Sequence, residues 1–399
     1  MEKQKCPEIR FKGFNEAWEF KKLEEVGAFN PSSSLPQSFE YVDLESVVGT
    51  ELLGSRSETI DSAPSRAQRL ACKGDVFYQA VRPYQKNNYL FDLSCDNYVF
   101  STGYIQIRPN INSQFLLNLV QKNDFVLRVL ENCTGTSYPA INTTGLKNIE
   151  AFISSHIDEQ GQIGEFFQNL DQSIALHEKK LAQTQKFKKA MLEKMFPKQG
   201  SNRPEIRLKG FSGDWNIEAI GDVLQEVFRP INLDNGTKYR LVTVKRRNGG
   251  IAERAILKGK DILVKSQFEV KAGDYIISKR QVVHGATGLV PPELDGSVVS
   301  NEYLVGQGTE KLSIEFFSLL STLPEMYQKF FLSSYGVDIE KLFFDVNDWK
   351  KREVLLPPLE EQVQISAFFK QVDKTLNLQQ QQLQTLKNLK QALLEKMFV

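Results

Sequence analysis

Residues 156–196 read HIDEQGQIGEFFQNLDQSIALHEKKLAQTQKFKKAMLEKMF, and residues 358–398 read PLEEQVQISAFFKQVDKTLNLQQQQLQTLKNLKQALLEKMF. The two stretches align without gaps at an offset of 202, with 16 of 41 positions identical and the same ending, LEKMF. A second repeat precedes each of them, because residues 7–26 and 204–223 share nine of 20 positions at an offset of 197. The chain is therefore built as variable block, shared block, variable block, shared block.

Both long shared stretches have the periodicity of coiled-coil helices. Apolar residues recur at alternating steps of four and three, and the first stretch contains no glycine or proline after Gly164 and the second none after Pro358. We expect two helices of about 35 residues, each about 50 Å long. The predicted seam consists of Phe167, Leu170, Ile174, Leu181, Met191, Phe369, Val372, Leu376, Leu383 and Leu393. Polar residues interrupt it at equivalent places, His177 with Gln379 and Lys188 with Lys390.

A single long helix of this kind usually packs on its own domain, but two equal copies favour helices that pack on each other, antiparallel. The length of 399 residues predicts two or three domains. The variable blocks alternate short strand-like and helix-like segments. Strands are predicted at residues 76–78, 104–107, 241–244, 275–277 and 298–299, and helices at 115–130 and 314–331.

The predicted fold class is α+β, with two globular α/β domains separated by a pair of long antiparallel coiled-coil helices in a pseudo-two-fold internal repeat. The breaker-rich segment PKQGSNRP, residues 197–204, links the first helix to the second domain. The predicted domains are 1–155, a first globular domain; 156–203, the first spacer helix and linker; 204–355, a second globular domain; and 356–399, the second spacer helix.

Composition excludes several classes of protein. Lys and Arg total 50 and Asp and Glu total 49, so the formal net charge is +1. No run of about 18 apolar residues occurs, and the charged segment from Met1 to Arg10 does not resemble a secretory signal. Four cysteines without CxxC spacing, Cys6, Cys72, Cys95 and Cys133, argue against a disulfide framework or a zinc site. We expect a cytoplasmic protein.

The sequence carries no recognisable catalytic motif. Its three histidines, His156, His177 and His284, lie in separate segments, so a histidine-based triad or metal cluster is difficult to build. It contains no GxxxxGK[ST] phosphate loop and no GxGxxG after a strand. The proline pairs at 291–292 and 357–358 lack the preceding Asn or Asp of an adenine-methylating tetrapeptide. We therefore predict neither catalysis nor a bound metal for this chain.

Two globular domains on a rigid spacer suit an extended ligand with two separated sites, and DNA is the natural candidate. Arg and Lys suit guanine, whereas Asn and Gln suit adenine. Four loops carry such residues beside aromatic ones, although any one of them could be a solvated basic turn. The candidate DNA-binding residues are Arg82, Tyr84, Gln85, Lys86, Asn87, Asn88, Ser137, Tyr138, Lys245, Arg246, Arg247, Asn248, Lys279, Arg280, Gln281 and His284.

The charge of each variable block limits how it could bind DNA. Residues 1–155 hold 16 basic and 18 acidic groups, and residues 204–357 hold 21 of each. Domains this close to neutral bind DNA poorly on their own at physiological salt. We infer that partner subunits supply much of the contact with phosphates.

Two other functions fit parts of the sequence. A coiled-coil adaptor whose domains bind proteins is compatible with both helices, and only the Arg, Lys, Asn and Gln content of the loops argues against it. A nuclease or methylase would need an active site, for which no motif is found.

The repeated segments resemble one family closely, the specificity subunit of type I restriction-modification systems. The resemblance covers nearly the whole chain and rests on the opening PEIRFKGF with its following Trp18, the second copy at 204–223, the segment LPPLEEQVQI at 356–365, and the LEKMF helix ends. Loops around Gly74 to Tyr84 and at 299–303 look like the family's recognition-domain patterns. The first copy departs from LPPLEEQ, with SSHIDEQ at 154–160.

The resemblance implies a subunit with two target recognition domains and two shared helical regions. Each domain would read one half of an asymmetric, gapped, double-stranded DNA sequence. The helices would set the gap and dock two methyltransferase subunits, which transfer methyl from S-adenosylmethionine to adenine. Restriction subunits would add ATP- and magnesium-dependent translocation and cleavage. The chain itself would be the reader, without catalysis or a cofactor of its own.

Overall fold

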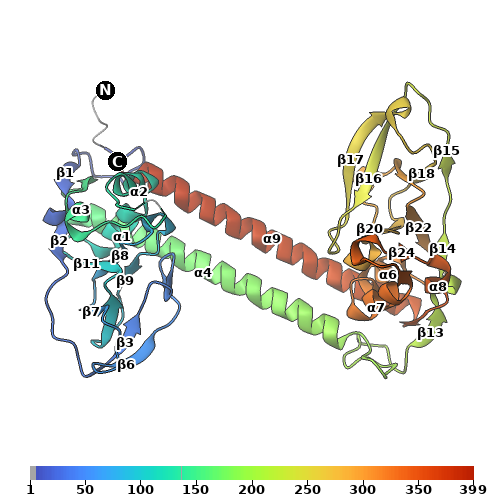
Figure 1. Cartoon of the computed structure of the whole chain (residues 1–399), viewed down its shortest axis with the longest axis horizontal. Coiled ribbons are helices and arrows are strands. Elements are labelled where there is room, and N and C mark those ends of the chain that lie inside the picture. The colour runs from blue at the N-terminus through green and yellow to red at the C-terminus, as the bar shows by residue number, and fades with distance from the viewer. Residues whose placement is uncertain (1–5, 136) are drawn as a thin grey trace. The chain divides into compact units, whose positions relative to one another are not determined.

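The computed structural model describes residues 6–135 and 137–399 and consists of two compact units (Figure 1). The first unit comprises Met1–Lys180 together with Gln379–Val399, and the second comprises Leu181–Leu378. The beginning of the predicted first domain, residues 1–5, and Thr136 lie outside the described residues. The domain boundaries expected from the sequence stay a prediction.

The first unit combines short strands with three short α-helices among the described residues. In the labels, β marks a strand, α an α-helix and η a short 3-10 helix. Its elements are β1 (Glu19–Lys22), η1 (Leu23–Val26), β2 (Gly27–Phe29), β3 (Ser38–Val42), β4 (Val47–Val48), β5 (Glu51–Leu52), β6 (Arg56–Thr59), β7 (Ala67–Leu70), β8 (Val76–Gln79), η2 (Pro83–Gln85), β9 (Tyr89–Leu90), β10 (Tyr98–Ser101), β11 (Tyr104–Pro109), α1 (Ser113–Gln121), α2 (Asn123–Glu131), α3 (Thr143–Lys147) and β12 (Glu150–Ile153).

The second unit repeats this order with longer strands in places. Its elements are β13 (Asn216–Ala219), α5 (Ile220–Val223), β14 (Leu224–Glu226), β15 (Pro230–Ile231), β16 (Lys238–Val244), β17 (Ile251–Lys258), η3 (Gly259–Asp261), β18 (Gln267–Val270), β19 (Tyr275–Ser278), η4 (Val282–His284), β20 (Thr287–Leu289), η5 (Pro292–Leu294), β21 (Ser297–Ser300), β22 (Tyr303–Gly308), α6 (Ile314–Leu320), α7 (Pro324–Leu332), β23 (Ser334–Tyr335), η6 (Ile339–Lys341), β24 (Phe343–Phe344), α8 (Val346–Lys350) and β25 (Glu353–Leu356).

The variable blocks share one sheet topology although their sequences differ. The sheet β2-β11-β8-β9 of the first unit corresponds to β14-β22-β19-β20 of the second. The sheet β6-β3-β10-β7 corresponds to β17-β16-β21-β18, to which β15 adds a fifth strand. In each case one central pair is parallel, β10 with β3 and β21 with β16. The repeat therefore extends through the whole chain, beyond the segments that align.

A buried aspartate occupies the same place in both units, before β8 and before β19. Asp75 accepts hydrogen bonds from Gln106 Nε2 at 2.6 Å and from Arg108 Nε, which reaches its other oxygen, at 2.8 Å. Asp274 accepts from Gln307 Nε2 at 2.8 Å and from Arg229 at 2.6 Å. The glutamines come from equivalent strands, but the arginines come from different elements. Each aspartate follows a glycine, Gly74 or Gly273, so this Gly-Asp pair marks a buried turn that the two units share.

The two helices expected within the variable blocks are each divided, so these predictions were wrong in detail. The helix expected at 115–130 is interrupted at Lys122, whose backbone is extended at φ −62° and ψ 140°. The helix expected at 314–331 is interrupted before Pro324, which starts α7. Proline is favoured in a first helical turn because that turn needs no N–H donor there. The predicted strands, by contrast, lie within β8, β11, β16, β19 and β21.

The long helices are α4 (Ile157–Lys194) and α9 (Leu359–Met397), and they run antiparallel within each unit. In the first unit Asp171 pairs with Lys390 at 2.5 Å, and Glu178 pairs with Lys387 at 2.6 Å. The second unit contains the repeat-related pair Lys188–Asp373, also at 2.5 Å. Both polar lysines of the predicted seam are therefore held by carboxylates. All ten predicted seam residues are buried or half-buried.

The main hydrophobic core of each unit contains one end of each long helix. In the first unit, Phe398 lies against Trp18, Phe115 and Phe167, with ring centroids 5.9, 5.0 and 6.1 Å away. In the second unit, Phe196 takes the equivalent place beside Trp215, Phe316 and Phe369. Burial of a phenylalanine side chain contributes roughly 1.5–3 kcal/mol. The repeated LEKMF ends are therefore core segments.

Gly164 lies where the start of α1 comes close to α4. A Cβ at this position would lie 2.7 Å from Asn112 Oδ1 and 3.1 Å from the Cβ of Gln114. Asn112 is the N-cap of α1, since its Oδ1 accepts a hydrogen bond from Phe115 N at 2.9 Å. The glycine thus lets the start of α1 rest directly on α4.

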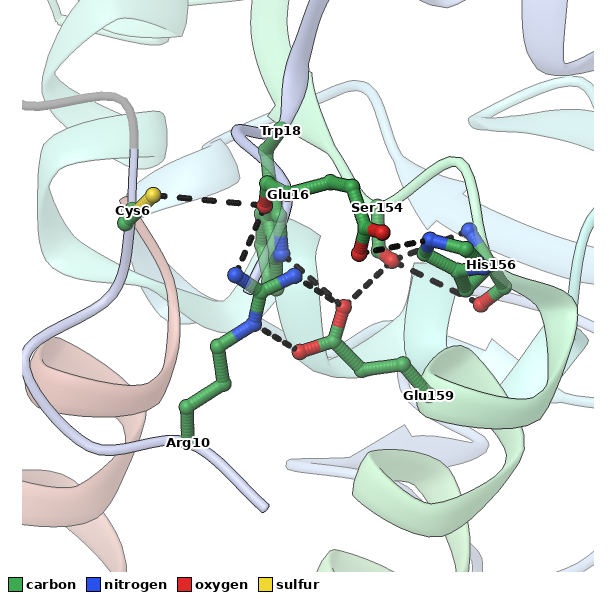
Figure 2. Close-up of polar contacts among 7 residues, drawn as sticks. All are labelled: Cys6, Arg10, Glu16, Trp18, Ser154, His156 and Glu159. Atoms are coloured by element: carbon green, nitrogen blue, oxygen red, sulfur yellow. Dashed lines mark hydrogen bonds and ion pairs between the residues drawn. The ribbon is translucent and has the colours of Figure 1, made fainter. Parts of the chain in front are cut away.

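A buried ion pair joins the opening repeat to α4 (Figure 2). Arg10 Nε donates to Glu159 Oε1 at 2.5 Å, and Arg10 Nη2 donates to Oε2 at 2.9 Å. Trp18 Nε1 and Ser154 Oγ also donate to this carboxylate, at 3.1 and 2.5 Å. Burial by itself raises the pKa of Glu159, but the hydrogen bonds from Arg10, Ser154 and Trp18 outweigh it and hold the pKa below its ordinary value.

The second unit has the same ion pair with fewer supporting donors. Arg207 Nε donates to Glu361 Oε1 at 2.9 Å, and Arg207 Nη2 donates to Oε2. Trp215 Nε1 is buried and has no hydrogen-bond partner among the described residues. Leu356 stands where the first unit has Ser154.

Across the described ranges, no helix is long and apolar enough to span a membrane.

Candidate nucleic-acid interface

Two of the four candidate DNA-binding loops follow equivalent strands in the two units. In the first unit the loop leaves β8 and contains η2, and in the second it leaves β19 and contains η4. These strands are central in their sheets and their side chains are buried. A rigid strand therefore positions each loop.

The candidate residues at 82–88 and 137–138 form the first cluster. Arg82 and the two tyrosines Tyr84 and Tyr138 form its exposed part. The Arg82 guanidinium carbon lies 4.4 Å from the ring centroid of Tyr138, and Arg82 N donates to the carbonyl oxygen of Pro139 at 2.8 Å. Tyr84 and Tyr138 are 49% and 63% exposed. Ser137 beside them is also exposed. Two loops that are far apart in sequence thus bring the Arg82 guanidinium and the Tyr138 ring together.

The backbone around η2 is held in a left-handed conformation on both sides. Arg82 has φ 55° and Lys86 has φ 57°, values that are uncommon for residues other than glycine. Such strain persists only where surrounding contacts determine it. Those contacts are made by Gln79, which donates through Nε2 to Gln85 Oε1 and accepts at Oε1 from Asn87 N.

The other candidates in this loop already have protein partners. Lys86 Nζ donates to the carbonyl oxygen of Gln121 at 2.8 Å and to Asn123 Oδ1 at 2.5 Å, and burial lowers the pKa of Lys86. Asn87 Oδ1 accepts from Gly49 N at 2.8 Å. Asn88 is buried, and its Oδ1 accepts from Gln79 N at 2.8 Å. The structure gives these side chains a role in shaping the loop, and their contact with DNA stays a prediction.

In the second unit the structure brings two predicted loops together. The β16–β17 hairpin turn at 245–250 contacts the segment after β19, because Arg247 N donates to His284 O at 2.7 Å and Asn248 N donates to Gly285 O at 2.8 Å. Arg247 and Asn248 are left-handed, at φ 58° and 54°. Lys245, Arg246, Arg247 and Asn248 are all exposed. The hairpin is drawn in yellow in Figure 1.

The candidate residues at 245–248 and 279–284 form the second cluster. Three of its cations, Arg246, Lys279 and Arg280, have partners within the protein. Arg280 Nε donates to Glu302 Oε2 at 2.9 Å, and its guanidinium lies 6.0 Å from the ring centroid of Phe343. Lys279 Nζ donates to the carbonyl oxygen of Asn301 at 2.9 Å. Arg246 donates through Nε to Gln281 Oε1 and through Nη2 to Glu340 Oε2, the latter at 2.5 Å.

The segment containing η6 joins the second cluster and was missed by sequence reasoning. Glu340 lies 94 positions after Arg246, which it contacts, and its Oε1 is 3.5 Å from His284 Nε2. Tyr335 and Phe343 are exposed aromatic residues of β23 and β24, with ring centroids 5.3 Å apart. The sequence near these residues offers one local signal, a turn with Gly336 between aromatic residues. That signal does not indicate which other segments of the chain the turn contacts.

Among the described residues, neither cluster has the composition of a metal centre. In the part of the chain that the structure describes, no group of three or more His, Cys, Asp or Glu side chains could hold a metal ion. The four cysteines are free. What the clusters offer is a set of hydrogen-bond donors, acceptors and aromatic rings on exposed loops, which is suited to recognition.

A family model matches this chain twice. The model for the type I restriction modification DNA specificity domain matches residues 15–186 and residues 212–388, and so covers most of the chain as two copies. A curated relative, the type I restriction enzyme HindI specificity subunit of Haemophilus influenzae, is 28% identical over 144 residues. That match covers 34% of this chain and 31% of the relative, so it spans about a third of the relative's length.

Two solved structures have a similar fold over almost their full length. One is a chain from a structure that addresses complex assembly and conformational transition of the type I R-M system, with a TM-score of 0.55, 21% identity, and coverage of 98% of this chain and 99% of that one. The other is the type I restriction-modification S subunit from M. genitalium, with a TM-score of 0.58, 12% identity and 99% coverage of both chains.

Proposed function

This chain belongs to the family of type I restriction-modification DNA specificity proteins, and from that membership we propose that it reads DNA sequence for a methyltransferase complex. Each unit reads one half of a gapped, bipartite target. Helices α4 and α9 set the gap and dock two methyltransferase subunits, through which restriction subunits join.

The observation that carries this proposal is the placement of two different side-chain clusters at the same point of a repeated fold. Arg82, which follows β8, meets Tyr138 of the loop between α2 and α3, whereas Gln281, which follows β19, meets Arg246 of the β16–β17 turn. Arginine and glutamine donate and accept in the patterns that distinguish base pairs in the major groove. Two equivalent sites with different residues are what a reader of two different half-sites requires.

The near-neutral charge of the variable blocks supports a role for partners. Phosphate contacts provide most of the affinity of DNA-binding proteins and depend on excess cations. Several cations of the second cluster are paired with carboxylates, as Arg280 is with Glu302. The methyltransferase subunits supply the missing phosphate contacts, and S-adenosylmethionine, ATP and magnesium are used by partner subunits. This chain contributes recognition and no catalytic group.

The test is a map of methylated adenines. The chain is expressed with a methyltransferase subunit from the same system in a host without DNA methylation, and modified bases are located by long-read sequencing. The expected result is one asymmetric motif with two short halves and a fixed gap. A continuous motif would mean that only one unit reads bases. An active methyltransferase that modifies no motif in the presence of this chain would favour an adaptor that binds proteins.

Exchange of one variable block tests modularity separately. Replacing residues 204–355 with the block of another family member is expected to change one half of the motif and to leave the other half and the gap unchanged. The unchanged half reports that the hybrid folds and assembles. A change in both halves would contradict independent reading by the two units.

A further inference from the structure

Glu340 occupies the centre of the second cluster, where three segments meet. Its carboxylate accepts from Arg246 Nη2 at 2.5 Å and from Nη1 at 3.4 Å, and it lies 3.5 Å from His284 Nε2. Gln281 accepts from the same guanidinium through Arg246 Nε. The side chains of Arg246 and Glu340 are 47% and 51% exposed. The pair therefore presents an acceptor and donors side by side to the solvent.

This pair does little to stabilise the fold. Exposed ion pairs contribute between nothing and about 1 kcal/mol, since water screens the charges and two flexible side chains must be ordered. The buried pair of Arg207 with Glu361, whose side chains are 8% and 1% exposed, is of a different kind. Stability therefore does not explain why a carboxylate lies among the candidate base-reading residues.

A carboxylate on a DNA-binding surface also has a cost, because it is repelled by the phosphates that the neighbouring cations attract. Carboxylates in such places have one favourable role. In the major groove, Glu or Asp accepts a hydrogen bond from N4 of cytosine, while Arg donates to O6 and N7 of guanine. An adjacent Arg and Glu can thus contact both bases of one G·C pair. A purine or pyrimidine that offers no donor leaves the carboxylate unpaired and is rejected.

We propose that Glu340 determines specificity in the second unit by accepting from cytosine N4, with Arg246 donating to the paired guanine, so that the half-site read by this unit contains a G·C pair at that position. The inference rests on the proposed function. The first cluster provides the contrast. Among the residues described there, Arg82 lies over the ring of Tyr138 and no carboxylate is paired with it. Only the half-site of the second unit depends on such a carboxylate.

The test compares the wild-type chain with Glu340→Gln, each assembled with the methyltransferase subunit. Both complexes select from a library of double-stranded DNA randomised in the second half-site, and methylated adenines are mapped in cells. The amide keeps the size of the side chain but can donate as well as accept. The expected result is that preference for the G·C pair falls by about tenfold at one position. The first half-site and the gap remain unchanged.

Glu253→Gln is the matched control. Glu253 is 48% exposed and pairs with Arg240 at 3.3 Å on the β16–β17 hairpin, outside the cluster. It is expected to leave the whole motif unchanged.

Three outcomes would overturn the inference. A second half-site without any G·C pair would contradict it directly. An unchanged motif with tighter binding of Glu340→Gln to every sequence would mean that Glu340 only screens charge. A motif altered equally by Glu253→Gln would mean that any lost charge has this effect. A wild-type complex with no gapped motif would instead remove the proposed function, and this inference with it.

Discussion

The two buried ion pairs of the repeat allow a matched comparison of Arg10→Met with Arg207→Met. The side chains of Arg10 and Glu159 are 11% and 0% exposed, and those of Arg207 and Glu361 are 8% and 1% exposed, so burial is nearly equal. Methionine retains an apolar stem but cannot neutralise the carboxylate. Each substitution therefore leaves a buried glutamate, and the two sites differ in what remains to stabilise it.

The expected magnitudes follow from the remaining donors. Leaving a buried charge without its partner costs about 3–5 kcal/mol. After Arg207→Met no described hydrogen-bond donor reaches Glu361, so the full cost applies. After Arg10→Met the Glu159 carboxylate keeps the donors Trp18 Nε1 and Ser154 Oγ. Hydrogen bonds to charged groups are each worth about 1.5–3 kcal/mol. Two retained bonds at the lower end of this range offset about 3 kcal/mol, so we expect Arg207→Met to be more destabilising by about 3 kcal/mol.

Hydrogen exchange followed by mass spectrometry measures each unit separately in the full chain. Peptides at 150–167 report the first unit, and peptides at 353–369 report the second. A difference of about 3 kcal/mol corresponds to roughly 150-fold in the opening equilibrium. Lys189→Met, which removes an exposed pair with Glu193, is the control and should change neither. Equal losses at the two sites, or a larger loss for Arg10→Met, would refute the reasoning.

Three further predictions concern pH, DNA contact and the helices. Because the pKa of Glu159 is lowered by folding, its contribution to stability is present above about pH 4.5 and is lost as pH falls through the folded-state pKa; acid unfolding of wild type should therefore be steeper than that of Glu159→Gln, and identical curves would contradict this. Replacing Arg246 and Arg247 with Ala should weaken DNA binding by the complex at least tenfold while subunit assembly, measured by size-exclusion chromatography, is unchanged; a loss of assembly would point to a docking role. Insertion of seven residues at both Gln183 and Thr385 should lengthen the gap by about three base pairs, at about 1.5 Å per helical residue and 3.4 Å per base pair; a constant gap in the methylation map would mean that the helices do not set it.

The sequence predicts the long helices well because their structure depends on one regular pattern. A stripe with a 3.5-residue period determines which side of α4 and α9 is covered, and Asp171, Lys188, Asp373 and Lys390 then pair as the repeat requires. The equal topology of the two variable blocks was less visible. The topology depends on which positions are buried, and many different residue types can fill a buried position. Asp75 and Asp274 are therefore among the few identical residues that the two variable blocks share.

The candidate site is where sequence reasoning was least complete. Local residue types identified Arg246 and Gln281, but nothing local indicates that they meet or that Glu340 joins them. Contacts between segments this far apart depend on sheet order, which the sequence alone did not provide. Residue type also did not indicate that Lys86 and Asn88 have partners within the protein, at Gln121 and Gln79, and their contact with DNA stays a prediction. Pro324, in contrast, was a local signal for a helix start within the segment expected to be one helix.

The division of the chain between the units has a consequence for biosynthesis. The second unit is one continuous segment, whereas the core of the first contains Leu394 and Met397 of α9 and the following Phe398. Nascent domains usually fold in the order in which they leave the ribosome. Here the unit that is begun first cannot complete its core until α9 has been translated. Premature termination before Leu394 would therefore damage the unit that contains the first 180 residues.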